Sequence, residues 1–289
     1  MKHALSFDIE DWFHIAGLPQ LERRGNWEQY PSIVEDKTNL ILDILDRYGV
    51  KATFFVLGWV AQKYPSLVRD IAARGHEIGT HGYWHYRVNT LSPDQFHDYL
   101  KQSVEVLEDL IGSKIKGYRA PSFSITQGNE WAFEVMSEMG IEYDASLFPA
   151  QRGHGGYDIE QGPQILSKEY FDTRFAELPM SMISFGSMNI PFSGGGYLRF
   201  WPKSVIKYGF NQLEKREIPG VVYLHPRDFA PDCPRVRMPL NRRFKCYIGL
   251  STTKGKLNML LQNFTFGTCQ EVLNDWNVLN RVNGDRPSK

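Results

Sequence analysis

Short apolar segments rich in strand-forming residues alternate with segments of helical periodicity from Ala4 to Leu224. The expected strands cover residues 4–7, 52–57, 77–80, 117–121, 141–144 and 219–224. The expected helices open near Pro31, Pro65, Ser92 and Trp131, and the glycines that end them are Gly49, Gly75, Gly112 and Gly140. This alternation is typical of a β/α barrel or a doubly wound sheet, in which helices cover parallel strands.

Polar side chains follow the carboxyl ends of these expected strands. They are Asp8, Glu10, Asp11, His81, His85, Arg119, Asp144 and His225. In a β/α barrel the carboxyl ends of the strands converge on one face, so side chains from distant parts of the sequence meet there. Scattered surface residues have no reason to select strand ends. The pattern therefore predicts a functional site on that face.

Two histidines four residues apart, His81 and His85, indicate a metal site when they are combined with a carboxylate from the acidic segment that follows the first strand. Two imidazoles and a carboxylate leave a coordination position open for water, as hydrolysis requires. Each piece also has a plain interpretation, because such a histidine pair can be incidental and an acidic strand end can be a solvated turn.

Composition excludes several classes of function. Lys plus Arg and Asp plus Glu both count 33, which argues against a protein whose main partner is nucleic acid or an anionic membrane surface. A basic segment, residues 235–245, is interpreted as a solvated loop, with contact to an acidic substrate as the alternative. The three cysteines have no metal-type spacing, and no segment has the length of a membrane span or the pattern of a secretory signal. We therefore expect a cytoplasmic protein without membrane insertion.

Five segments, in this order along the chain, resemble the motifs of the polysaccharide deacetylases, the NodB-homology or carbohydrate esterase family four. They are residues 6–11, 81–85, 119–121, 144–146 and 224–226. The acidic start Asp8–Phe13, the segment Ser193–Phe200 and an extension after Pro226 are closest to the subfamily associated with exosortase and exopolysaccharide gene clusters.

The resemblance implies a distorted (β/α)7-type barrel over residues 1–238. An extension over residues 239–275 is expected to lie against the barrel, and residues 276–289 are expected to form a disordered tail. The implied activity is hydrolysis of N-acetyl groups on a hexosamine-containing polysaccharide or its precursor. Two alternatives stay open: a cyclic amide or imide amidohydrolase on the same fold, and a non-catalytic glycan-binding descendant.

The resemblance also implies a metal centre. His81 and His85 are expected to bind a divalent metal, with zinc preferred and cobalt, nickel and manganese as alternatives. Family members use the carboxylate directly after the base as the third ligand, but Ile9 occupies that position here. We expect Asp11 to substitute. Glu10, which shares the strand face of Asp8, is the alternative.

The remaining roles follow from the same resemblance. Asp8 is expected to be the general base, oriented and kept ionised by Arg119, and His225 the general acid, oriented by Asp144. An ordinary surface ion pair for Arg119 and a helix cap for Asp144 are the alternatives. The expected substrate-binding residues are Trp12, Tyr83, Trp84, Pro121, Gly195 and Tyr197, where the aromatic rings either stack on sugar or belong to the core.

Overall fold

The computed structural model describes residues 1–150, 156–166, 174–185 and 188–279. Its strands are β1 (Lys2–Ile9), β2 (Thr53–Val56), β3 (Glu77–Thr80), β4 (Gly117–Tyr118), β5 (Tyr143–Asp144), β6 (Gln164–Leu166), β7 (Phe175–Glu177), β8 (Met182–Phe185), β9 (Met188–Pro191), β10 (Val221–Leu224) and β11 (Thr265–Gly267). The six strands expected from the sequence correspond to β1–β5 and β10. The short strands β6–β9 were not predicted.

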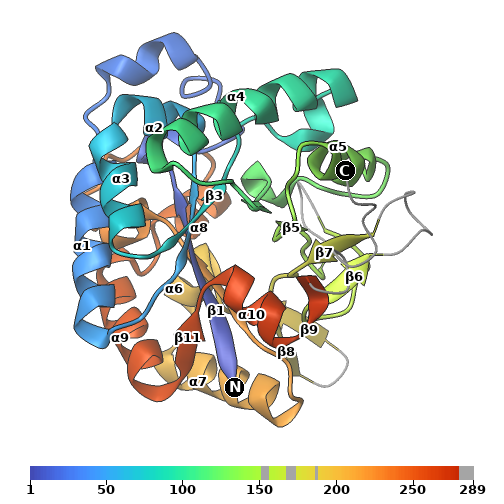
Figure 1. Cartoon of the computed structure of the whole chain (residues 1–289). Coiled ribbons are helices and arrows are strands. Elements are labelled where there is room, and N and C mark those ends of the chain that lie inside the picture. The colour runs from blue at the N-terminus through green and yellow to red at the C-terminus, as the bar shows by residue number, and fades with distance from the viewer. Residues whose placement is uncertain (151–155, 167–173, 186–187, 280–289) are drawn as a thin grey trace.

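The main sheet is curled, with its strands in the order β10-β1-β2-β3-β4-β5-β7-β6 (Figure 1). Every neighbouring pair in this order is parallel except β7 and β6, which are antiparallel. Within the described ranges no ladder joins β6 to β10, so the barrel stays open. The expectation of a distorted β/α barrel is confirmed.

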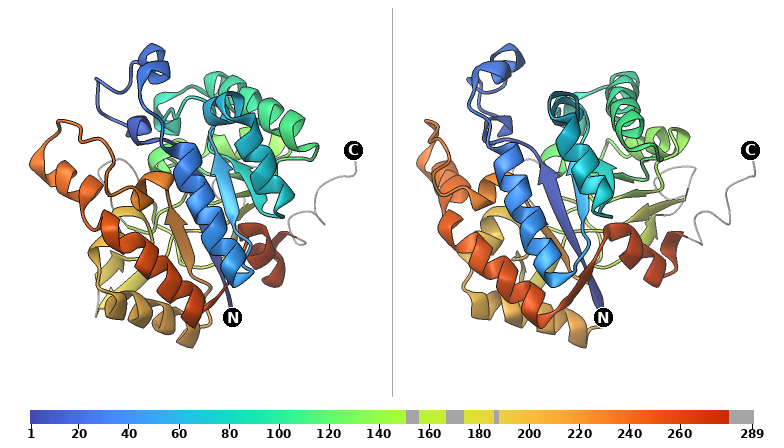
Figure 2. Two further views of the ribbon diagram at one scale, coloured as in Figure 1. Left: turned by 90° about the vertical axis from the view of Figure 1, so that its left-hand side faces the viewer. Right: turned by 60° about the vertical axis from the view of Figure 1, so that its left-hand side comes forward.

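Helices connect the strands, and most of them cover the outside of the sheet. They are α1 (Val34–Tyr48), α2 (Gly58–Lys63), α3 (Pro65–Ala73), α4 (Pro93–Ile111), α5 (Trp131–Glu138), α6 (Gly195–Phe200), α7 (Lys203–Lys215), α8 (Leu240–Tyr247), α9 (Thr253–Asn263) and α10 (Cys269–Asp275). The helices α1, α3 and α9 lie over the outer side next to β1 and β2 (Figure 2). None of the helices in the described part of the chain is both long and apolar enough to cross a bilayer.

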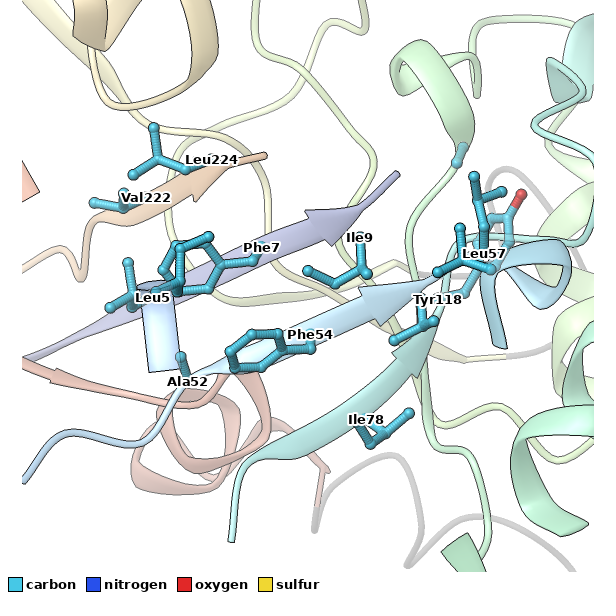
Figure 3. Packing of buried hydrophobic residues seen from close by; sticks show 14 of the residues in the cluster. Leu5, Phe7, Ile9, Ala52, Phe54, Leu57, Ile78, Tyr118, Val222 and Leu224 are labelled. Carbon is cyan, nitrogen blue, oxygen red and sulfur yellow. The ribbon is translucent and has the colours of Figure 1, made fainter. Parts of the chain in front are cut away.

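The larger core cluster lies between the sheet and the helices outside it, and a second cluster, which includes Ala4, Phe55 and Tyr143, lies on the inner face. Leu5, Phe7 and Ile9 of β1 project to the helix side, together with alternate residues of the neighbouring strands such as Phe54 and Leu224 (Figure 3). Because successive side chains of a strand point to opposite faces, the even-numbered residues of β1 project to the inside of the barrel. Both faces of β1 are buried, so the alternation of the strand decides which side chains reach the inner face.

The C-terminal part of the chain joins the sheet. The strand β11 pairs in parallel with the first residues of β1, and Phe266 lies opposite His3. Val278 and Leu279 are buried, so the expected disordered tail is wrong for these two residues. Residues 280–289 of that tail lie outside the described residues. The expected boundary after residue 238 stays a prediction.

Candidate active site

The strand ends bring the sequence-predicted polar residues together. Glu10 and Asp11 follow β1, His81 follows β3, Arg119 follows β4 and His225 follows β10. All five are buried or nearly so, and they come from four parallel strands of one curled sheet. The convergence that the alternating pattern predicted is therefore present at the carboxyl ends of these strands.

Asp8 is held by a fully buried arginine. Arg119 Nη1 donates to Asp8 Oδ1 at 2.9 Å and to Ser6 Oγ at 2.7 Å, and its Nε donates to the Ala145 carbonyl oxygen at 3.0 Å. The guanidinium cannot lose its proton under ordinary conditions, so it stabilises the ionised carboxylate. Asp8 Oδ2 is left to face the centre of the site. The expected pairing of Asp8 with Arg119 is present.

The tautomer of His81 follows from its hydrogen bond. Its Nδ1 lies 2.8 Å from the carbonyl oxygen of Arg119, which can only accept, so Nδ1 carries the proton. Burial lowers the pKa of His81 to about 4, so the ring is neutral near pH 7. The unprotonated Nε2 is the form of imidazole that binds a metal, with its orientation fixed by the backbone.

Glu10 and His85 face each other. His85 Nε2 lies 2.8 Å from Glu10 Oε2, yet that buried oxygen makes no hydrogen bond. Burial opposes ionisation of Glu10, but His85, with help from His225 and Arg227, holds its pKa well below the usual range. A carboxylate oxygen and an imidazole nitrogen this close need a proton or a cation between them. The backbone of His85 has φ +57°, a left-handed conformation that is rare for a side-chain-bearing residue and marks local strain.

The residues present fit a divalent metal. One ligand atom each from Glu10, His81 and His85 lies within 4.8 Å of the other two. Neutral imidazoles and a carboxylate are the ligand types that zinc prefers, and three protein ligands leave a position open. Of the two carboxylates considered from the sequence, the structure thus brings Glu10 to the histidines.

Asp11 has a different task. Its carboxylate accepts hydrogen bonds from the Trp12 N–H at 2.8 Å, from Ser32 Oγ at 2.5 Å and from the Ile33 N–H at 3.1 Å. It therefore caps the short 3-10 helix Trp12–His14 and ties it to the segment before α1. The preference for Asp11 as the third ligand is corrected here: its position is one residue out of phase with Asp8 and Glu10, and its oxygens already have partners.

Asp144 does not bond to His225. Its carboxylate accepts from the Ser146 N–H at 3.0 Å and from Ser146 Oγ, and it shares a hydrogen bond with Glu177. Burial raises the pKa of both carboxyl groups, that of Asp144 to about 6, so the pair holds a proton between them. The alternative of a local cap describes Asp144 better than the expected role beside the acid.

His225 is instead held by Asp228, which sequence reasoning missed. Asp228 Oδ2 lies 2.9 Å from His225 Nδ1 and accepts the His225 N–H at 2.9 Å. Burial alone would lower the pKa of His225, but the Asp228 carboxylate outweighs it and raises the pKa. The available signal was an acid three residues after the histidine, placed to close the short 3-10 helix Pro226–Phe229.

The expected substrate-binding residues divide into two groups. Trp12 and Tyr83 are buried, with Trp12 Nε1 bonded to the Pro31 carbonyl and the Tyr83 hydroxyl bonded to Gln62, so their rings belong to the core. Pro121 is likewise buried, whereas Trp84 and Tyr197 are partly exposed. Gly195 lies beside His225, because a Cβ there would come within 3.7 Å of His225 Cε1.

A cavity of about 230 Å³ adjoins the metal-type group. Its lining includes His85, Trp84, Trp27 and His14. A larger hollow of about 430 Å³ lies against α8 and is lined by none of the site residues, so size does not identify the site here. The smaller cavity is the one that a sugar ring next to His85 could occupy.

Comparison with known proteins finds a family match over the part of the chain that includes His81, His85 and Arg119. The family model described as polysaccharide deacetylase matches residues 26–143. The chain carries a polysaccharide deacetylase domain. A second model, a domain of unknown function (DUF3473), matches residues 145–274. The expected resemblance is confirmed, and the deacetylase domain is followed directly by the second region, which includes Arg199, His225 and Asp228.

Relatives of the deacetylase domain are found among curated proteins and solved structures. A peptidoglycan-N-acetylglucosamine deacetylase of Bacillus cereus is 39% identical over 98 residues, which are 34% of this chain and 36% of that protein. The match spans only about a third of the length of the first curated relatives. The structure of a Mycobacterium smegmatis protein assigned to the polysaccharide deacetylases covers 99% of this chain and 94% of its own, with TM-score 0.63 and 20% identity. An allantoinase covers 99% and 91%, with TM-score 0.61 and 14% identity. These two structures show the fold alone.

Proposed function

We propose that this protein is a metal-dependent deacetylase that hydrolyses N-acetyl groups of a hexosamine-containing glycan or its precursor. The observation that carries the proposal is the position of His225, whose Nε2 lies 3.7 Å from Asp8 Oδ2 and 3.7 Å from Glu10 Oε1. A base, an acid and the Glu10–His81–His85 group therefore surround one point. The Bacillus cereus relative, named for its action on N-acetylglucosamine in peptidoglycan, supports the substrate class.

Asp8 would act as the general base. Neutral water is a poor nucleophile towards an amide, so a proton must leave the water as its oxygen bonds to the acetyl carbon. Arg119 occupies Asp8 Oδ1, which orients the carboxylate and leaves Oδ2 to accept that proton.

His225 would act as the general acid. When the C–N bond breaks, the departing sugar nitrogen must receive a proton, because an amide anion does not leave unaided. The hydrogen bond from His225 Nδ1–H to Asp228 directs the Nε2 proton towards the centre of the site. The products are acetate and a free amine on the sugar, and one water is consumed.

Glu10, His81 and His85 would hold the metal, with zinc preferred over cobalt, nickel and manganese because of the ligand set. When bound, the metal supplies a Lewis acid that lowers the pKa of a water and polarises the acetyl carbonyl. The chain itself fixes the ligands, through the Arg119 carbonyl at His81 and the strand face at Glu10.

The substrate and location are also part of the proposal. A sugar ring in the cavity beside His85 would contact Trp84, whose ring is partly exposed there. Action in the cytoplasm on a precursor before export completes the proposal. Detection of mature, exported polymer as the only substrate would overturn that last point.

The test is acetate release from N-acetylglucosamine oligomers by metal-stripped protein, with and without added zinc or cobalt. Asp8→Asn removes the base, and Asp98→Asn, at an exposed position of α4, is the matched control. We expect metal-dependent release that Asp8→Asn abolishes and Asp98→Asn leaves intact.

Two other results would replace the proposal. Hydrolysis of a cyclic amide or imide, without release from the oligomers, would assign the site to ring opening. Binding of the oligomers with no turnover in any metal, and equal affinity in Asp8→Asn, would indicate a glycan-binding descendant.

A further inference from the structure

A buried chain of contacts leads away from His225. Asp228 holds His225 through one carboxylate oxygen, and its other oxygen, Oδ1, lies 2.9 Å from Arg199 Nε. Asp228 is fully buried and Arg199 is 3% exposed. An unpaired carboxylate at such a depth would be costly, so Arg199 is what allows Asp228 to stay ionised beside the acid.

The rest of the Arg199 guanidinium is bound by the carboxyl end of α8. Nη1 donates to the carbonyl oxygens of Cys246 at 3.1 Å and Ile248 at 2.6 Å, and Nη2 donates to that of Lys245 at 3.1 Å. The last carbonyls of a helix lack partners within the helix and carry partial negative charge, so a cation is well placed there. Arg199 thus joins the end of α8 to Asp228.

The backbone of Arg199 is held from the same region. Lys256 of α9, itself buried, donates from Nζ to the Arg199 carbonyl at 2.6 Å and to that of Leu198 at 3.1 Å. Gly249 has φ +64°, and a Cβ there would lie 2.3 Å from the Arg199 carbonyl oxygen. Residues 245–256 therefore surround Arg199 at both its side chain and its backbone, and we call them the C-terminal clamp.

We propose that Arg199 is a positioning residue for the His225 acid and that the C-terminal clamp acts in the reaction by holding Arg199 in place. This deepens the proposed function and rests on it. The clamp touches neither the Glu10–His81–His85 group nor Asp8 in any described contact. Its effect reaches the site through the acid, which gives the region matched by the model of a domain of unknown function a part in the leaving-group step.

The leaving group separates this role from a merely structural one. An amine needs a proton as it departs, whereas 4-nitrophenolate leaves readily without an acid. In Arg199→Met we expect kcat for acetate release from N-acetylglucosamine oligomers to fall by about 100-fold. KM should be unchanged, and so should hydrolysis of 4-nitrophenyl acetate by the metal-loaded protein. Arg199→Lys, which keeps the charge but not the fork of donors, should recover part of the loss.

Two further variants complete the design. Arg243→Met makes the same change on an exposed position of α8 and should alter neither activity. Lys256→Met leaves the guanidinium in place but removes the donor to the Arg199 backbone, and should reduce amide hydrolysis selectively, though less than Arg199→Met. It also keeps the proposal testable where Arg199→Met does not fold, as judged by circular dichroism.

A measurement that needs no turnover, the protonation of the His225 ring, tests the positioning role of Arg199 separately from the deacetylase activity. In the full chain labelled with 15N-histidine, the His225 ring should show a proton on Nδ1, and Arg199→Met should lose that preference. Equal loss of ester and amide hydrolysis, or an unchanged His225 tautomer in Arg199→Met, would overturn the positioning role. If the wild-type protein releases no acetate, but Arg199→Met still changes the His225 tautomer, the deacetylase activity is refuted and the positioning role of Arg199 stands.

Discussion

Replacing each of two neighbouring acids, Glu10 and Asp11, by its amide should separate metal binding from the stability of the segment after β1. Glu10→Gln removes the charged oxygen that faces His85 at 2.8 Å, whereas Asp11→Asn alters a carboxylate that already has protein partners. We expect Glu10→Gln to weaken zinc binding by about 100-fold or more, beyond the loss typical of outer partners of a metal site. Asp11→Asn should leave the zinc affinity of the folded protein unchanged.

The cost of Asp11→Asn can be worked from its contacts. The carboxylate accepts from Ser32 Oγ and from the backbone N–H groups of Trp12, Ile33 and Val34. Hydrogen bonds to a charged group each contribute about 1.5–3 kcal/mol, but they share two oxygens and the asparagine keeps one of them. We therefore expect the free energy of unfolding to fall by about 2–3 kcal/mol.

Two measurements on the same samples decide the matter. Zinc affinity is measured by competition with a chromophoric chelator, and stability by urea denaturation of the metal-free protein at pH 7.5. A folded Asp11→Asn protein that has lost zinc, beside a Glu10→Gln protein that retains it, would refute the ligand assignment and restore Asp11 as the ligand.

Three more outcomes are expected. Burial lowers the pKa of His76 to about 4, with Lys51 adding to the effect, so the ring is neutral when folded and takes a proton more readily when unfolded. The stability that this contributes is present above the unfolded pKa of about 6.5 and is lost as the pH falls towards 4. His76→Asn should therefore lose about 2 kcal/mol less than wild type between pH 7.5 and 5 in urea denaturation, and equal losses would contradict the shift. Gly82→Ala places a Cβ 1.9 Å from the Tyr99 hydroxyl at φ +73° and should destabilise by about 3 kcal/mol or more in urea, whereas Gly112→Ala, at φ +67° with open space, should cost only about 1–2 kcal/mol. Zinc at 100 times its Kd should add about 2.7 kcal/mol to the stability of stripped protein, read as a rise in Tm, and no rise would argue against the metal site.

Most of the strands and helices, and the residues on the inner face of the site, could be predicted from the sequence. The glycine stops and the capping pattern at Ser92 place α4 where it was expected. Strand parity made Glu10 the alternative ligand, because it continues the face of β1 on which Ser6 and Asp8 lie, and Arg119 bonds to those two. The resemblance to a motif with adjacent acids favoured Asp11, whereas the structure brings Glu10 to the two histidines.

Other parts could not be predicted because they depend on contacts between distant segments. The partner of His225 was sought at another strand end, Asp144, although a capping residue three positions away, Asp228, was the nearer candidate. Nothing in the sequence relates Arg199 to the end of α8, because the pairing rests on backbone carbonyls that every residue possesses.

The pairing of β1 has a consequence for how the protein matures on the ribosome. Asp8 and Glu10 are made before β2 and long before β10, yet β1 lies between those two strands, and 216 residues separate Ser6 from the Val222 carbonyl to which it bonds. At a synthesis rate of about 5–20 residues per second, β1 waits tens of seconds until β10 is made. The strand β11, which also pairs with β1, is made later still. Contacts this far apart in sequence slow folding, so nascent chains that stop before β10 should expose an unpaired edge of β1 and be substrates for chaperones.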